Sequence, residues 1–186
     1  MWLDVDNNGK SDYCRLIYTY THLRCNLNKI DTWKTVETGY VDGGYYDLRF
    51  NIKMSYTHDN YCRIVDDYKK MRCTEIQQND ILNDYTVDLP FKITGKVGIE
   101  FNDIDGDGFD DLCRYDSSNN QVQCYLNENK KFSNDPISLA LSGTPLVDLG
   151  EFSTKVIGAR QSSSAQSAIC YNVGFGSMRC DIFEIY

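Results

Sequence analysis

The chain has 186 residues, of which 25% are charged and 41% are hydrophobic, and its formal net charge is -8 at pH 7. This composition excludes a disordered tail, and the absence of a long apolar run argues against membrane insertion by a helix. Because binding to nucleic acids depends on a basic face, the acidic balance also argues against a nucleic-acid partner and suits cations instead.

The chain begins with Met1 and Trp2 and soon reaches two acidic residues, Asp4 and Asp6. A basic segment followed by an apolar one, the pattern of a signal peptide, is not found at this end of the sequence. A chain that begins in this way is typical of a mature form or of a segment of a longer precursor. We therefore infer the cellular compartment from the cysteines.

Eight cysteines divide the chain into four similar repeats. Three pairs are eleven residues apart and the last pair is ten apart: Cys14 with Cys25, Cys62 with Cys73, Cys113 with Cys124, and Cys170 with Cys180. An even number at regular spacing predicts disulfides and a secreted, extracellular or cell-surface location. We expect a single domain of four repeats, at about 1–48, 49–97, 98–150 and 151–186.

Each cysteine pair brackets alternating sequence rich in tyrosine and β-branched residues, such as residues 14–18 and 24–27. This alternation predicts two antiparallel strands, with the two cysteines facing each other across a hairpin. Further strand candidates are residues 35–41 and 45–54, whereas no segment shows a helical stripe with caps. The predicted fold class is all-β, in repeats about the size of a four-stranded propeller blade.

The third repeat contains an aspartate loop over residues 103–111. Its carboxylates stand at alternate positions, the backbone carbonyl of Phe109 is available between them, and Gly108 permits a tight turn. The predicted ligands are Asp103, Asp105, Asp107, Phe109 and Asp111. Such oxygens suit Ca²⁺; the alternative, an ion-free turn, would crowd carboxylates that repel one another. Because Arg114 replaces the glutamate that closes an EF-hand, this loop is not an EF-hand.

The first repeat carries the same pattern 99 residues earlier, with one carboxylate fewer. Its predicted ligands are Asp4, Asp6, Asn8, the carbonyl of Lys10, and Asp12. We therefore expect one or two calcium ions, with weaker binding at the first loop. The matching windows at residues 52–60 and 160–168 lack the carboxylates, and we expect them to bind no ion.

The D-x-D-G-D-G-x-x-D loop and its repetition every 45 to 60 residues resemble the FG-GAP or VCBS-type repeats of integrin-α-like β-propellers. The resemblance implies that each repeat is one blade and that the calcium loop joins two strands. Four repeats would then form part of a propeller, a small four-bladed ring, or half of a ring that a homodimer or neighbouring repeats complete.

The function implied by the resemblance is a non-catalytic recognition, adhesion or scaffold module that binds an extracellular protein. The alternative is a calcium-containing lectin that stacks glycans on Trp2, Trp33 or tyrosines, and a remote alternative is an accessory domain of a secreted hydrolase. With His22 and His58 as the only histidines and every cysteine in a pair, we expect no enzyme activity. The cysteine spacing is also too wide for a typical zinc site.

The arginines that follow the first cysteine of three repeats, Arg15, Arg63 and Arg114, form a further regular feature. We expect them to pair with nearby aspartates or carbonyl groups. A second set of arginines immediately precedes the second cysteine of three repeats: Arg24, Arg72 and Arg179. This set could form a basic stripe that binds a partner.

Overall fold

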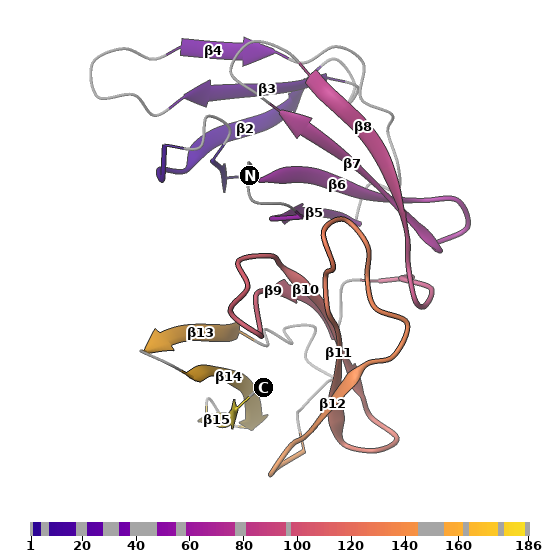
Figure 1. Ribbon diagram of the computed structural model, residues 1–186, viewed down its shortest axis with the longest axis vertical. Coiled ribbons are helices and arrows are strands. Elements are labelled where there is room, and N and C mark those ends of the chain that lie inside the picture. Colours follow the sequence, from indigo (N-terminus) through magenta and orange to yellow (C-terminus); the bar gives the residue numbers. More distant parts are fainter. Residues whose placement is uncertain are drawn as a thin grey trace. The chain divides into compact units, whose positions relative to one another are not determined.

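The computed structural model describes residues 2–4, 8–17, 22–27, 34–37, 48–54, 59–76, 81–95, 98–144, 155–161, 164–174 and 177–184. Within these ranges the fold is all-β, with four separate antiparallel sheets (Figure 1). The predicted fold class is therefore confirmed at this level. Among the described residues, no helix is long and apolar enough to cross a membrane.

Each sheet is a meander in which the strands pair in the order of the sequence. The first sheet contains β1 (Trp2–Leu3), β2 (Asp12–Ile17), β3 (His22–Leu27) and β4 (Lys34–Glu37). The second contains β5 (Arg49–Ile52), β6 (Asn60–Val65), β7 (Lys70–Ile76) and β8 (Ile81–Asp88). The third contains β9 (Ile99–Asn102), β10 (Asp111–Asp116), β11 (Gln121–Tyr125) and β12 (Ile137–Ala140). The fourth contains β13 (Lys155–Gln161), β14 (Ser164–Gly174) and β15 (Ser177–Glu184).

Each sheet falls within one of the four expected repeats, and the chain separates into two compact units, Met1–Thr94 and Gly95–Tyr186. Each unit thus contains two sheets. The grouping of all four repeats into a single domain, and their arrangement as propeller blades, stay predictions. Of the strand expected at residues 35–41, the first three residues lie in β4, and the rest lie outside the described ranges.

A disulfide joins two neighbouring strands in every sheet, as the cysteine spacing predicted: the two central strands in the first three sheets, and β14 with β15 in the fourth. The bonded cysteines stand directly opposite each other in the strand register, with Cα–Cα distances of 4.0 to 4.1 Å. This short distance is typical of the non-hydrogen-bonded pairs of an antiparallel ladder, where facing side chains are closest. The disulfide therefore fixes the register of each hairpin.

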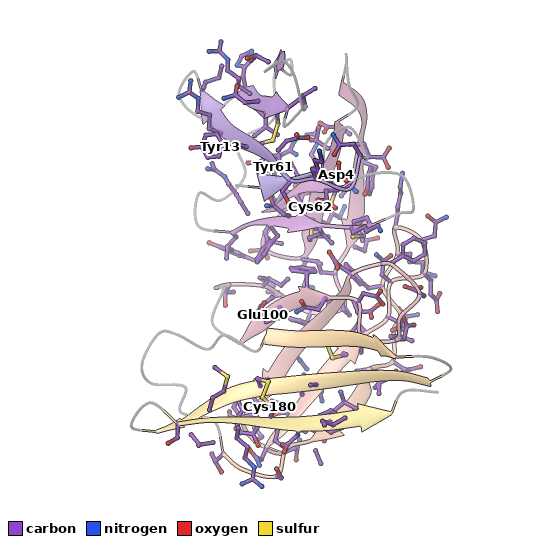
Figure 2. All side chains as sticks on the ribbon, turned by 90° about the vertical axis from the view of Figure 1, so that its left-hand side faces the viewer. Asp4, Tyr13, Tyr61, Cys62, Glu100 and Cys180 are labelled. Carbon is purple, nitrogen blue, oxygen red and sulfur yellow. A yellow bond between two sulfur atoms is a disulfide. The ribbon has the colours of Figure 1, made fainter. Side chains whose placement is uncertain are left out.

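The strand pattern of period two determines which side chains are buried. In β3, Leu23, Cys25 and Leu27 are at most 1% exposed, whereas the residues between them are half-buried. In the second unit, the third and fourth sheets share a core in which Cys113 and Val122 pack with Ile169 and Tyr171. Side chains and disulfides of both units are drawn in Figure 2.

Candidate cation-binding site

The loop between β9 and β10 brings three carboxylates together. One oxygen from each of Asp103, Asp105 and Asp111 lies within 4.8 Å of the other two. Asp111 is fully buried, and the other two are half-buried. Three convergent carboxylates offer the oxygen ligands that a hard cation such as Ca²⁺ requires. In the part of the chain that the structure describes, this is the one group of three acidic side chains placed in this way.

Backbone amides shape the loop around the carboxylates. Asp103 accepts hydrogen bonds from the amides of Gly106 at 2.7 Å and Gly108 at 3.0 Å. Both glycines have positive φ angles, +81° and +96°, which L side chains rarely adopt, so the turn depends on them. Asp105 accepts from the amide of Asp107 at 3.0 Å. Each carboxylate retains further lone pairs, and so can also bind a cation.

Two further predicted ligands lie in the same loop but outside that group of three. Asp107 is exposed, and its Oδ1 accepts the amide hydrogen of Phe109 at 2.8 Å. Although the side chain is exposed, partial desolvation by the surrounding loop raises the pKa of Asp107 above its ordinary value; the hydrogen bond from Phe109 opposes the shift, and the negative charges of Asp105 and Asp103 add to it. The side chain of Phe109 is 5% exposed, so it anchors the loop in the interior.

Asp111 is held by two backbone amides, one from its own loop and one from the segment after β11. Its carboxylate accepts from the amide of Ile104 at 2.9 Å and from that of Asn127 at 2.7 Å. Burial raises the pKa of Asp111 to about 7; these two hydrogen bonds oppose the shift, and the charges of Asp105 and Asp107 reinforce it. A bound cation would offset the cost of keeping this carboxylate ionised in the interior.

Asn127 also belongs to this site, although it lies outside the aspartate loop itself. Its side-chain amide donates to the carbonyl of Asp110 at 3.2 Å, and its Oδ1 accepts from the amide of Lys130 at 3.0 Å. The residue is 2% exposed. The sequence contains a signal that links Asn127 to the loop. Leu126 and Asn127 repeat Leu27 and Asn28 at the same offset of 99 residues that relates the two loops.

The first loop reproduces part of this geometry. Asp4 accepts from the amide of Gly9 at 2.8 Å, and Asn8 accepts from that of Lys10 at 2.8 Å. These hydrogen bonds match those made by Asp103 and Asp107. Asp12 is fully buried, as Asp111 is, whereas Asp6 lies outside the described residues. The cation site predicted here therefore stays a prediction.

The second repeat replaces the buried aspartate with a neutral residue. Asn60 occupies the position before Tyr61 and Cys62 that Asp111 occupies in the third repeat, and it is also fully buried. Its Oδ1 accepts a hydrogen bond from the Tyr85 hydroxyl at 2.9 Å. This hydrogen bond gives the side-chain oxygen a partner within the protein. The windows at residues 52–60 and 160–168 are only partly described, and their lack of an ion stays a prediction.

The arginines after the first cysteines differ in their partners. Arg63 lies beside Asp84, at 3.4 Å, and so pairs with an aspartate as expected. Arg114 instead donates from Nε and Nη2 to the side-chain oxygen of Gln123, at 2.9 and 2.7 Å. Arg179 lies 3.7 Å from Asp181, so this member of the proposed basic stripe has a carboxylate beside it.

Comparison with known proteins gives two similarities, and no protein-family model matches the chain. Over 171 residues the chain is 50% identical to the NAD(+)–arginine ADP-ribosyltransferase Chelt of Vibrio cholerae. This match covers 91% of the chain but only 28% of that relative's length. The fold is similar to part of the Photorhabdus luminescens Tc holotoxin pore (mutation TccC3-D651A), with a TM-score of 0.66, 16% identity, and coverage of 97% of this chain and 9% of that chain.

In the light of these similarities, the expected relationship to integrin-α-like FG-GAP or VCBS repeats is wrong. The similar sequence is an ADP-ribosyltransferase and the similar structure belongs to a toxin. The physical reason lies in the motif on which the resemblance rested. Alternating aspartates and glycines determine only how a turn can present oxygen atoms to a cation. The same local chemistry can occur in proteins of different function.

The expected functions are corrected by the same finding. A non-catalytic adhesion or recognition module, a lectin, and the absence of enzyme activity are all contradicted by the similarity to an ADP-ribosyltransferase. The expectation rested on the scarcity of histidines and the lack of a free cysteine. Cleavage of a glycosidic bond needs neither, because carboxylates can stabilise the positive charge that develops on the sugar. Trp33 and His58, which entered those arguments, lie outside the described residues.

Proposed function

We propose that this chain is a β-structured part of a toxin-type enzyme that transfers ADP-ribose from NAD⁺ to arginine. The observation that carries the proposal is the 50% identity over 171 residues to Chelt, which is named for this activity. The chain spans 28% of that relative's length, so the activity is proposed for the protein as a whole. We assign no residue of this chain to the transfer step.

The reaction has a simple balance. The bond between the nicotinamide nitrogen and C1′ of the ribose breaks, and nicotinamide leaves with the bonding electrons. A guanidine nitrogen of arginine then bonds to C1′ and releases a proton. The ribose carries positive charge in the transition state, and carboxylates placed beside it lower the barrier.

The disulfides place this protein among secreted proteins, because paired structural cysteines persist in oxidising compartments. We propose that it acts in a toxin assembly with protein partners, since the fold also occurs within a holotoxin. A cell-surface location and a blade-like arrangement of the four sheets belong to the same proposal. The succession of similar antiparallel sheets along the chain supports the blade-like arrangement.

Calcium is proposed as the cofactor of the third-repeat loop, with a weaker second ion at the first loop. The support is the convergence of Asp103, Asp105 and Asp111 within 4.8 Å, together with a buried aspartate whose ionisation a cation would favour. Removal of the ion would leave these charges close together in a half-buried loop. We therefore expect the ion to stabilise the fold of the second unit.

An acceptor assay tests the activity directly. The whole protein, to which the activity is assigned, is purified and incubated with NAD⁺ and agmatine, a soluble guanidine, and the products are followed by mass spectrometry. We expect free nicotinamide and ADP-ribosyl-agmatine in equal amounts. Cadaverine, which presents an amine in place of the guanidine, is the matched control acceptor and should give no adduct. Protein that is folded by circular dichroism but forms no agmatine adduct would contradict the proposal.

A further inference from the structure

The first aspartate loop contains an asparagine that directly precedes a glycine, Asn8 before Gly9, and no other asparagine in the sequence does so. When the backbone nitrogen of the next residue attacks the side-chain carbonyl carbon of an asparagine, the side chain loses ammonia and then becomes a carboxylate. A following glycine favours this attack because it has no Cβ beside the nitrogen. The matching position in the third loop, 99 residues later, holds a carboxylate already, that of Asp107. The first loop therefore has a reactive asparagine where its counterpart has an aspartate.

Hydrogen bonds hold both reacting groups in place. The backbone nitrogen of Gly9, the attacking atom, donates to Asp4 Oδ2 at 2.8 Å. The side-chain oxygen of Asn8, on the carbon to be attacked, accepts from the backbone nitrogen of Lys10 at 2.8 Å. Asp4, which is labelled in Figure 2, also accepts from the backbone nitrogen of Asn8 at 3.0 Å. A carboxylate thus lies where it can take a proton from the attacking nitrogen, and an N–H group lies where it can stabilise negative charge on the attacked carbonyl.

The loop is also open to water, which the reaction consumes. Asn8, Gly9 and Lys10 are exposed, whereas Asp4 is half-buried. Among the described residues, no atom beyond the chain neighbours of Gly9 lies within 4 Å of the point where a Cβ of Gly9 would stand. The side-chain amide of Asn8 therefore has room to rotate toward the nitrogen of Gly9, as ring closure requires.

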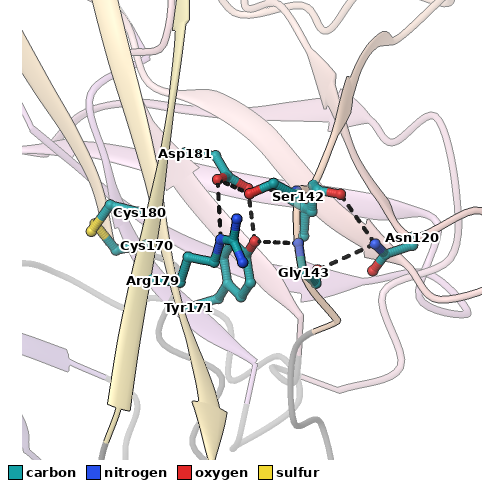
Figure 3. Close-up of polar contacts among 9 residues, drawn as sticks. Asn120, Ser142, Gly143, Cys170, Tyr171, Arg179, Cys180 and Asp181 are labelled. Carbon is teal, nitrogen blue, oxygen red and sulfur yellow. Dashed lines mark hydrogen bonds and ion pairs between the residues drawn. A yellow bond between two sulfur atoms is a disulfide. The ribbon is translucent and has the colours of Figure 1, made fainter.

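Asn120, in the turn between β10 and β11, shows the opposite arrangement (Figure 3). Its side-chain nitrogen, which would be the leaving group, donates to the carbonyl oxygens of Leu141 and Gly143, each at 3.2 Å. Its side-chain oxygen accepts from the Tyr115 hydroxyl at 3.0 Å. These contacts direct the amide to other segments, and the next residue, Gln121, carries a side chain. We expect Asn120 to stay unreacted, so it serves as an internal reference.

We propose that Asn8 is a modification site at which the protein deamidates itself, with Asp4 as the proton acceptor. Gly9 N bonds to Asn8 Cγ, and the proton of that nitrogen passes to Asp4 Oδ2. The bond between Cγ and Nδ2 then breaks, and Nδ2 takes the proton from Asp4 and leaves as ammonia. Water opens the cyclic imide that remains, which yields aspartate or isoaspartate at position 8. The reaction needs no co-reactant besides water and is independent of the proposed transferase activity.

The aspartate product gives the first loop the same set of side-chain ligands as the third loop. Ligand charge contributes to calcium affinity, so calcium binding at the first loop should strengthen as the protein ages. This consequence rests on the calcium ion proposed above, whereas the reaction at Asn8 does not. A deamidated protein that binds calcium no more tightly would therefore contradict the calcium site of the first loop and leave the modification established.

Peptide mapping of the full chain, after storage at neutral pH with a chelator, tests the proposal. The peptide that contains Asn8 should gain about 1 Da, because a side-chain amide becomes an acid. Fragmentation of that peptide locates the change. The protein should release ammonia in equal amount, and the peptide that contains Asn120 should keep its mass.

Three variants test the assigned roles. Asp4→Asn should react at least about tenfold more slowly, because the proton acceptor beside the attacking nitrogen is lost. Gly9→Ala should also react more slowly, because its methyl group hinders that nitrogen. The matched control is Asp59→Asn, which removes the charge of a carboxylate that accepts from the Asp4 amide at 2.9 Å, and it should react at the wild-type rate. Circular dichroism verifies that all three variants fold.

Any of three results overturns the proposal. If the folded wild type keeps its mass at Asn8, or changes there no faster than at Asn120, the loop does not promote the reaction. If Asp4→Asn reacts as fast as the wild type, Asp4 does not accept the proton. If Asp4→Asn and Asp59→Asn slow the reaction equally, nearby negative charge in general, rather than the contact with the attacking nitrogen, controls the rate.

Discussion

Arg63 and Asp84 form an ion pair in which the arginine side chain is fully buried and Nη2 lies 3.4 Å from Oδ2. Arg72, directly opposite Arg63 in the register of β6 and β7, lies 3.0 Å from the same oxygen. Two like charges that face each other across a ladder repel, and the shared carboxylate compensates them. Arg63 also donates to Thr74 Oγ1 at 2.8 Å and lies 5.6 Å from the centre of the Tyr61 ring.

Replacing Asp84 with asparagine should therefore destabilise the first unit strongly. The substitution leaves the buried Arg63 beside Arg72 without the carboxylate, at an expected cost of about 2–4 kcal/mol in the free energy of unfolding. Urea denaturation measures this change. The matched control is Asp67→Asn, which removes the carboxylate of an exposed pair with Lys92 at 2.6 Å and should leave the midpoint unchanged. Equal effects of the two substitutions would contradict the assigned role of Asp84.

Calcium should raise the melting temperature of the protein, and excess chelator should lower it. In the double variant D103N/D105N, calorimetric titration should show loss of the stronger site, because two of the three convergent carboxylates are removed. Asp116→Asn is the control, since Asp116 is the last residue of β10, away from the aspartate loop, and accepts from the amide of Ser118 at 3.0 Å. Calcium binding by the double variant equal to that of the wild type would refute the ligand assignment.

The four disulfides should differ in their sensitivity to reductant. Cys180 is exposed, whereas the six cysteines of the first three disulfides are at most 2% exposed. Thiol–disulfide exchange requires a thiolate to reach one sulfur, so the Cys170–Cys180 bond, labelled at Cys180 in Figure 2, should open first. Brief treatment of the folded protein with dithiothreitol, alkylation and peptide mapping would show it. Earlier labelling of Cys62 or Cys73 would contradict this order.

Glu100 makes the stability of the second unit depend on pH. It stands opposite Cys113 in the ladder, on the face that packs into the core, and burial raises its pKa from 4.5 to about 7. The folded state therefore favours the neutral acid, and this contribution to stability, complete below pH 4.5, is lost as the pH rises through about 7.

Glu100→Gln mimics the neutral acid at every pH. Its melting temperature should match that of the wild type near pH 4.5 and exceed it near pH 8, where the wild type carries a half-buried charge. Glu128→Gln, at an exposed carboxyl, is the control and should show the same difference from wild type at both values. A constant difference for Glu100→Gln would mean that the side chain does not titrate as its burial predicts.

Local patterns allowed the hairpins and the aspartate loop to be predicted from the sequence. Alternation fixes which residues share a strand face, and paired cysteines fix which strands are neighbours. The contacts of Asn127 with Asp111 and of Arg63 with Asp84 were not predictable in the same way, because they join residues 16 and 21 positions apart through the pairing of strands. The family was misassigned because the loop motif encodes cation chemistry and carries little information about the rest of the protein.

The placement of the disulfides also bears on how the polypeptide is exported. Every bond joins cysteines only 10 or 11 residues apart, and none connects one sheet with another. Short loops close at low entropic cost, so the nearest cysteine is the favoured partner among the many pairings that eight thiols allow. During secretion from the N-terminus, each hairpin can therefore oxidise as soon as it emerges, without waiting for the next repeat and without later reshuffling by an isomerase.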